Sequence, residues 1–86
     1  MNVNQLILLI KSKIEQNILI QNIIIKDKTF LHKKHLSHKL GKFHLEIRIQ
    51  SEELNKLNKI QATKKIYKIL DEEIKKYIHS IQILIN

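Results

Sequence analysis

The chain has 86 residues, which is enough for one domain with one modest hydrophobic core. Its 16 Lys and Arg residues against 8 Asp and Glu residues give a formal net charge of +8, so its surface attracts nucleic acid, anionic membrane or an acidic protein. Cysteine is absent, which excludes disulfides and also excludes an iron–sulfur cluster or structural zinc held by the chain's own thiolates.

The first predicted elements are an amphipathic helix, a strand and a loop. From about residue 3 to residue 16, the apolar residues Leu6, Ile10 and Ile14 recur at the spacing of one helix face. Residues 18–26 are rich in β-branched Ile, which predicts a strand that is covered on much of both faces. The apolar pattern then gives way to Lys and His, and this predicts a long, exposed, basic, His-rich loop over about residues 27–42.

The clearest strand pattern covers residues 43–50. Apolar side chains at odd positions alternate there with polar ones, so one face should pack on the core and the other should meet water. Ser51 is a suitable N-cap for a short helix, because Glu52 and Glu53 follow it in the first turn.

A longer helix and a last strand complete the predicted elements. The apolar spacing predicts a single helix over residues 61–77, and its wet face carries three acidic residues interpreted as solubility charges: Asp71, Glu72 and Glu73. The last strand, over residues 78–85, should place on one face His79, Ile81 and Ile83.

The order of these elements is helix, strand, strand, short helix, helix, strand. We therefore predict an α+β fold, a two-layer sandwich with a three-stranded mixed sheet. Its first two strands should pair antiparallel, and the last should run parallel to its neighbour after a helical crossover. The last strand can leave an open edge, through which the chain could form a homodimer.

No segment has the pattern of a membrane anchor or a secretory signal. The longest early apolar run, residues 6–10, is far too short to span a bilayer, and Lys11 and Lys13 follow it. It lacks a preceding basic segment and a small-residue cleavage site. We expect a single domain over residues 1–86 that is soluble, cytoplasmic and without membrane contact.

Several short patterns along the chain resemble those of the BolA family. The family's loop motif, Asp-x-Ser-x-x-His-x-x-His, is matched by Asp27, Thr29 in place of Ser, His32 and His35. Its second strand typically opens with His and an apolar residue, a Ser precedes its short helix, and its last strand begins with an almost universal His. These positions are occupied by His44, Ser51 and His79.

Two family motifs are replaced in this chain. Residues 54–56 are Leu-Asn-Lys where the family has Phe-x-Gly, and residues 62–64 are Ala-Thr-Lys where it has Arg-His-Arg. In the family, the start of this helix can serve partner contact or nucleic-acid binding. The missing His argues against carrying such a role over to this chain.

The resemblance implies a fold similar to the class II KH arrangement and a monothiol glutaredoxin as partner. In the family, the heterodimer can hold a two-iron, two-sulfur cluster for which glutaredoxin and glutathione supply thiolates. The BolA protein supplies the His of the last strand and a His or Cys from the first loop. The isolated chain should bind no cofactor tightly. Some members are also described as transcription regulators.

Histidines are the candidate ligands, because the chain has no thiol. On the residues alone, His79 would be a half-buried side chain bonded to the backbone, whereas the resemblance favours a cluster ligand. His32 and His44 rank above His35 as the second ligand.

An enzyme is not expected, because the sequence has no nucleophile with an adjacent base and no phosphate-binding glycine loop. The alternative function is that of a nucleic-acid-binding, transcription-regulator-like domain with a basic helix-turn-helix-like face, for which weak, non-specific binding is expected. Against it, the chain has one Gly and one Arg, so a Gly-x-x-Gly loop and bidentate guanine contacts are lacking. The lysines of this face would be Lys56, Lys59, Lys64, Lys65 and Lys68.

Overall fold

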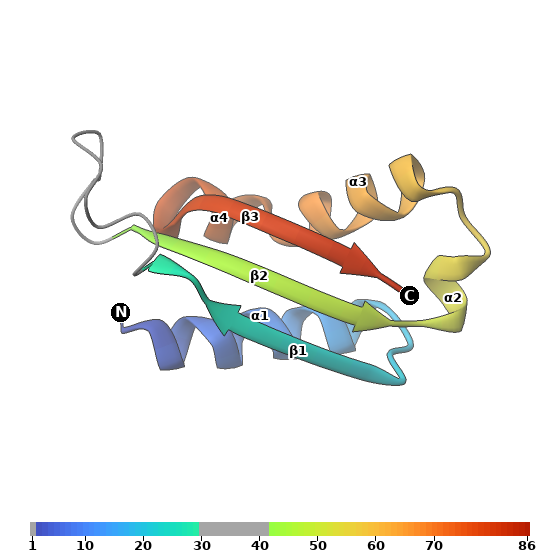
Figure 1. Cartoon of the computed structure of the whole chain (residues 1–86), viewed down its shortest axis with the longest axis horizontal. Helices are drawn as coiled ribbons and strands as arrows, with labels where there is room; N and C mark the ends of the chain where they lie inside the picture. The colour runs from blue at the N-terminus through green and yellow to red at the C-terminus, as the bar shows by residue number, and fades with distance from the viewer. Residues whose placement is uncertain (1, 30–41) are drawn as a thin grey trace.

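The computed structural model describes residues 2–29 and 42–86. In chain order, its elements are α1 (Val3–Asn17), β1 (Asn22–Asp27), β2 (Phe43–Gln50), α2 (Glu52–Asn55), α3 (Lys59–Ile69), α4 (Asp71–Tyr77) and β3 (Ile78–Ile85). The sheet has the order β1-β2-β3, with β1 antiparallel and β3 parallel to β2. The helices form a second layer behind the sheet (Figure 1), which confirms the predicted α+β class and element order.

Helix α1 follows the prediction closely. Asn2 and Gln5 cap its start reciprocally, each side chain accepting a hydrogen bond from the other residue's backbone N–H. The predicted stripe of Leu6, Ile10 and Ile14 is fully buried against the sheet and the other helices. These residues therefore anchor the helix layer.

Strand β1 differs from its prediction in its first residue and in the burial of its two faces. It begins at Asn22, because Ile18 completes α1 by donating its N–H to the Ile14 carbonyl. Ile23 and Ile25 pack on the core, whereas Ile24 between them is 45 % exposed. The prediction of cover on both faces was wrong, because the described helices all lie on one side of the sheet.

Strand β2 occupies the centre of the sheet and supplies the middle of the core. Leu45, Ile47 and Ile49 are buried on the helix side, as their alternation predicts. Ser51 is the predicted N-cap of α2: its hydroxyl accepts from the Leu54 N–H and donates to the Leu19 carbonyl. This buried residue therefore links the end of β2 to the α1–β1 connection.

The predicted long helix is two helices that meet at Leu70. Leu70 leaves the helical conformation (φ −98°, ψ 13°) but remains fully buried. Three acidic residues follow it immediately, and acidic side chains favour a new helix start because a helix N-terminus carries partial positive charge. Two of these acidic residues form i,i+4 ion pairs along α4, Asp71 with Lys75 at 3.0 Å and Glu72 with Lys76 at 2.8 Å.

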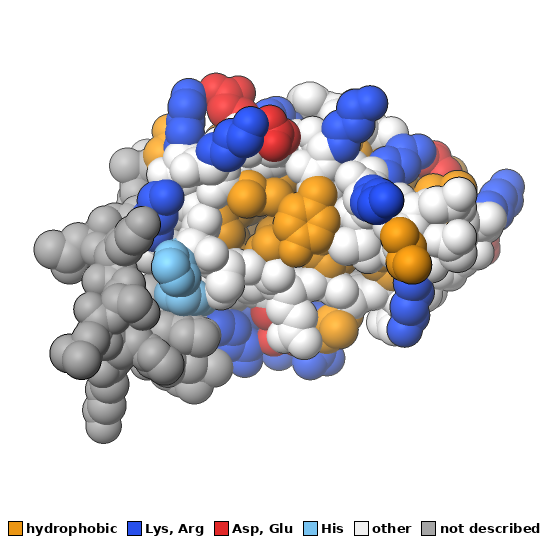
Figure 2. All heavy atoms as spheres, turned by 90° about the horizontal axis from the view of Figure 1, so that it is seen from above, with side chains coloured by type: hydrophobic (Ala, Val, Ile, Leu, Met, Phe, Trp, Pro, Cys, Tyr) orange, Lys and Arg blue, Asp and Glu red, His pale blue; other side chains and the backbone are white. Residues whose placement is uncertain are grey.

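The β3 side of the molecule is less completely covered than its centre. The core-facing side chains of β3 remain partly exposed, namely Ile81, Ile83 and Ile85. Figure 2 shows this side, with apolar side chains gathered in the middle of the face and lysines around them.

Part of the predicted loop lies outside the described residues, including His32, His35 and His38. Of that prediction, the structure describes Asp27 at the end of β1, then Lys28, Thr29 and, before β2, Lys42. In the described ranges, no helix is long and apolar enough to cross a membrane.

Candidate functional site

The face of β2 that points away from the helices carries His44, Glu46 and Arg48. We predicted that this row would meet water, which is correct for Arg48. His44 and Glu46, however, are only 4 % and 6 % exposed. The Glu46 carboxylate is 2.8 Å from Arg48 Nε and 3.6 Å from Lys28 Nζ. The hydrogen bond from Arg48, reinforced by the nearby charges of Arg48 and Lys28, holds the pKa of Glu46 below its ordinary value, against the opposing effect of burial.

His44 and His79 lie next to each other at one end of the sheet. Their ring centroids are 4.9 Å apart, and the rings meet edge to face at 61°. His44 Nδ1 is 2.6 Å from the hydroxyl oxygen of Ser80, which neighbours it on β3. The structure therefore brings together two of the predicted ligands, His44 buried and His79 exposed.

A register shift between β2 and β3 separates His79 from the alternation of its strand. Phe43 pairs with Ile78, but the next residue, His44, pairs with Ser80, so β3 has one extra residue at His79. Such a bulge bends the strand and redirects the side chain of the extra residue. The predicted common face with Ile81 is therefore not observed, since the His79 ring contacts His44 on the other face of β2. Nothing in the sequence marks this bulge.

Two residues of the loop motif hold the backbone of His44. Thr29 donates its N–H to the Asp27 carboxylate at 3.0 Å, and its hydroxyl also bonds that carboxylate. The same hydroxyl accepts from the His44 N–H at 3.2 Å, while the Lys28 N–H donates to the His44 carbonyl at 2.7 Å. The Asp27-x-Thr29 pattern thus fixes the start of β2, a structural role that the motif alone did not reveal.

An open hollow of about 320 Å³ lies beside His44 on the open face of the sheet. Its lining includes Lys28, His44, Glu46, Ser80 and Gln82. Among residues 2–29 and 42–86, no three His, Cys, Asp or Glu side chains gather closely enough to hold a metal ion. The described site is therefore a pair of imidazoles, not a set of three or four ligands.

The spacing of the two rings suits coordination of one metal ion. With a metal–nitrogen bond of about 2 Å, each ring centroid stands about 3 Å from the metal, so two bonds at the tetrahedral angle of about 109° separate the centroids by about 5 Å. The observed 4.9 Å is close to that value. Because Ser80 engages Nδ1, coordination by His44 would use Nε2, with Nδ1–H donating to the Ser80 hydroxyl.

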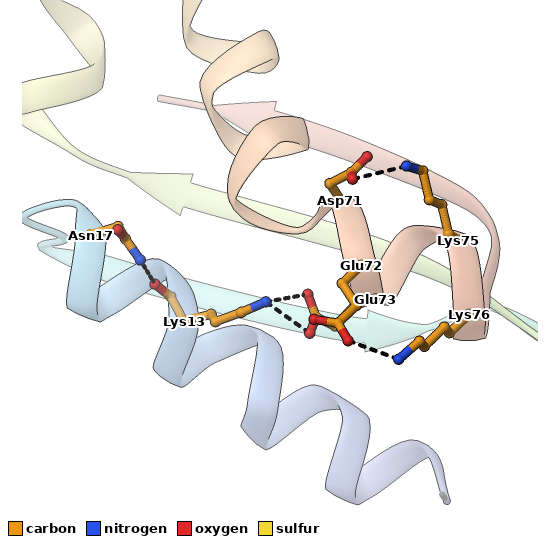
Figure 3. Close-up of polar contacts among 7 residues, drawn as sticks. All are labelled: Lys13, Asn17, Asp71, Glu72, Glu73, Lys75 and Lys76. Carbon is orange, nitrogen blue, oxygen red and sulfur yellow. Dashed lines mark hydrogen bonds and ion pairs between the residues drawn. The ribbon is translucent and has the colours of Figure 1, made fainter.

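Glu73 is an acidic residue whose prediction was wrong. It is buried between α4 and α1, and both of its carboxylate oxygens accept from Lys13 Nζ, at 2.8 Å and 2.9 Å (Figure 3). Its place three residues after Leu70 continues the buried stripe of the helix, a sequence pattern that could have identified it. This pair joins two helices and lies apart from the histidines.

The lysines proposed for nucleic-acid binding are divided between two flanks of α3. Lys59 lines a hollow beside the end of β3, whereas Lys65 and Lys68 line one beside Asn17 of α1. Lys65 is also 3.2 Å from Glu53, whose pKa is lowered by the hydrogen bond from the Leu19 N–H and then by Lys65. Lys59 on the one hand, and Lys65 and Lys68 on the other, therefore border different hollows.

Comparisons with known proteins agree with this architecture. The model of the family described as BolA-like protein matches residues 14–86. The BolA domain of SufE1 from Arabidopsis thaliana has a similar structure, with a TM-score of 0.80 and 20% identity over 100% of this chain and 93% of that chain. BolA1 from Arabidopsis thaliana has a TM-score of 0.74 and 20% identity over 90% of this chain and 85% of that chain. No curated protein matches the sequence.

Proposed function

The chain belongs to the BolA-like protein family, and from this membership and the His44–His79 pair we propose that it is an adaptor sharing a two-iron, two-sulfur cluster with a monothiol glutaredoxin. The observation that carries the proposal is the 4.9 Å separation of the two rings, which suits two ligands on one iron. The cluster is cargo here, held between two proteins and passed on.

The ligand chemistry supports a shared cluster. The chain has no cysteine, so it contributes imidazole nitrogen, while the glutaredoxin and glutathione contribute the two thiolates. Two imidazoles on one iron and two thiolates on the other is the ligand pattern of Rieske centres. Imidazole nitrogens also protonate near neutral pH, which offers a route for release of the cluster to a recipient.

The two histidines have different roles in this proposal, because one is exposed and the other is buried. His79 is exposed, so it can meet a cluster presented by a partner. His44 is buried and oriented by the Ser80 hydroxyl and the Thr29 contact to its backbone, so its ring is already in position before the partner arrives. In this proposal the chain positions ligands and catalyses no bond-breaking step.

Anaerobic cluster reconstitution with a monothiol glutaredoxin and glutathione tests this function. Visible circular dichroism distinguishes the glutaredoxin homodimer from a mixed complex. We expect the native chain to convert the homodimer spectrum to a new one, and His79→Ala and His44→Ala to leave the homodimer spectrum unchanged. His38→Ala, a histidine substitution outside the proposed ligands, is the matched control and should behave as the native chain.

Two outcomes would contradict the proposal. If the native chain leaves the spectrum unchanged, the adaptor function fails. If His79→Ala is inactive but His44→Ala is fully active, the second ligand is not His44, and His32→Ala and His35→Ala then test the loop histidines. Nucleic-acid binding remains a separate prediction, recognised by a steep dependence on salt and by indifference to His79→Ala.

A further inference from the structure

The two edges of the sheet differ in how they are protected. Edge strands expose unpaired backbone groups, and proteins commonly protect them with charged side chains or Pro. At one edge, β1 ends in Lys26 and Asp27. At the other edge, residues 80–86 include no charged side chain and no Pro. Among the described residues, the β3 edge is therefore open to pairing with another strand.

The backbone of β3 shows which groups face outward. The Asn86 N–H donates to the Ile49 carbonyl at 2.8 Å, so Asn86 pairs toward β2. In a parallel ladder, residues alternate between pairing with one neighbour and facing the other side. The outward residues are thus Ile81, Ile83 and Ile85, whose N–H and carbonyl groups have no strand neighbour within the described residues.

A hollow beside this edge can take side chains of an added strand. It measures about 180 Å³, and its lining includes Ile83 and Ile85 from β3 and Lys59 and Thr63 from α3. Tyr67 follows Thr63 by four residues, hence on the same flank of α3, and is 40 % exposed. The apolar area of this side, bordered by lysines, is visible in Figure 2.

The lysine charge beside the β3 edge indicates which kind of strand would bind there. Within residues 2–29 and 42–86, Lys59, the lysine that lines this hollow, makes no ion pair, so its charge is free to meet an acidic side chain. A second copy of the chain would bring its own net charge of +8 and be repelled. A peptide backbone offers alternating donors and acceptors that match the β3 edge, which a nucleic acid does not.

We propose that the β3 edge and the adjoining flank of α3 bind an extended acidic segment of a partner protein, which adds to the sheet as a fourth strand. Alternate apolar side chains of the segment would enter the hollow against Ile83 and Thr63, and an acidic side chain would meet Lys59. From His79 to Ile85 the strand rises by about 20 Å, so this surface is separate from the histidine pair and independent of the proposed function.

A set of three synthetic octapeptides tests the proposal by NMR titration of the full chain. The first alternates Val and Glu. The second and third carry the same residues with N-methyl groups on either all Val or all Glu amides. In an added strand, only one of these two sets of amides faces β3 and donates hydrogen bonds to it. The peptide methylated on that set should bind at least about tenfold more weakly than the parent peptide, and the other methylated peptide should bind like the parent. Shifts should concentrate on residues 81–86 and 59–67.

Charge-reversal variants supply the matched control on the protein side. Lys59→Glu should weaken the parent peptide by about fivefold, because it reverses the charge at the hollow. Lys11→Glu makes the same change in net charge on α1, beside β1, and should leave the affinity within about twofold.

Several results would overturn the proposal. They are the absence of binding, equal binding of all three peptides, or shifts centred away from β3. Self-association through β3 in sedimentation without peptide would make a second copy the occupant. Stronger shifts of the same resonances by an oligothymidine than by the parent peptide would make nucleic acid the occupant.

Discussion

The two faces of the sheet use one strand for different purposes. On the helix side, β2 contributes Leu45, Ile47 and Ile49, which are buried because apolar side chains surround them. On the opposite side, it contributes His44 and Glu46. His44 is buried beside the Ser80 hydroxyl of β3, and Glu46 is buried between Arg48 of the same strand and Lys28, which follows β1. Burial alone therefore does not identify a core residue. The covered face stabilises the fold, whereas the open face holds the polar groups on which the proposed function rests.

Substitutions at two neighbouring residues of β2, one on each face, should differ strongly in their effect on the free energy of unfolding. Ile47→Ala removes a fully buried side chain and should lower the free energy of unfolding by about 3–4 kcal/mol. Arg48→Ala, one residue later on the open face, should cost less than about 1 kcal/mol, because Arg48 is half-exposed and its partner retains Lys28. Urea unfolding measures both. Equal losses would contradict the division between the faces.

Substitution of Glu73 tests whether a charged residue on the helix side of the molecule contributes to the free energy of unfolding. Glu73→Gln removes a buried carboxylate that binds Lys13 with both oxygens, and should lower the free energy of unfolding by about 2 kcal/mol. Glu72→Gln is the matched control on the adjacent exposed residue, with an expected loss below about 0.5 kcal/mol. Reconstitution with glutaredoxin should be unaffected in both folded variants, and a loss specific to Glu73→Gln would place that residue in the functional site.

Ser80 tests whether the open face orients its ligand. Ser80→Ala removes the hydroxyl that holds His44 Nδ1 and should weaken cluster binding in the mixed complex by about tenfold, while the unfolding midpoint changes little. Gln82→Ala, the next residue on the same face of β3, is the control. A chelator competition assay measures the affinity. Equal affinity of the Ser80→Ala and native complexes would remove the orienting role.

The smallest expected effect concerns pH and the open face. The pKa of Glu46 is lowered in the folded state, first by the hydrogen bond from Arg48, so its ionised form favours folding. This contribution is present above the ordinary pKa of about 4.5 and is lost as the pH falls through the lowered folded value. The difference in unfolding free energy between the native chain and Glu46→Gln should therefore be present at pH 7 and vanish near pH 2. A constant difference across this range would show that the ionised form is not what matters.

Much of the fold could be predicted from periodicity. Strand β2 and its alternation, the Ser51 cap and the stripe of α1 follow from spacings within one segment. The break at Leu70 and the late start of β1 were missed. In both places an apolar residue belongs to the end of a helix: Leu70 ends α3 before α4 begins, and Ile18 completes α1 before the chain reaches β1.

The site was only partly predictable. His79 and His44 were identified as candidates from the family resemblance, but their contact depends on strand order and on a bulge. A register shift arises from the pairing of two strands distant in sequence, so no local pattern reports it. The same holds for the Ser80 hydroxyl, whose partner is 36 residues away in the chain.

Pulsed electron paramagnetic resonance of the reduced mixed complex tests whether His44 and His79 both bind the cluster. The chain would be labelled with ¹⁵N and the glutaredoxin left unlabelled, so only nitrogens of this chain give ¹⁵N couplings to the cluster. Ligation by His44 and His79 predicts two strongly coupled ¹⁵N nuclei. Two such nuclei in the native complex would support ligation by both histidines. If His44→Ala retains a cluster, the coupling of one of the two nuclei should be lost. A native complex with no strongly coupled ¹⁵N, or with both couplings intact in His44→Ala, would contradict it.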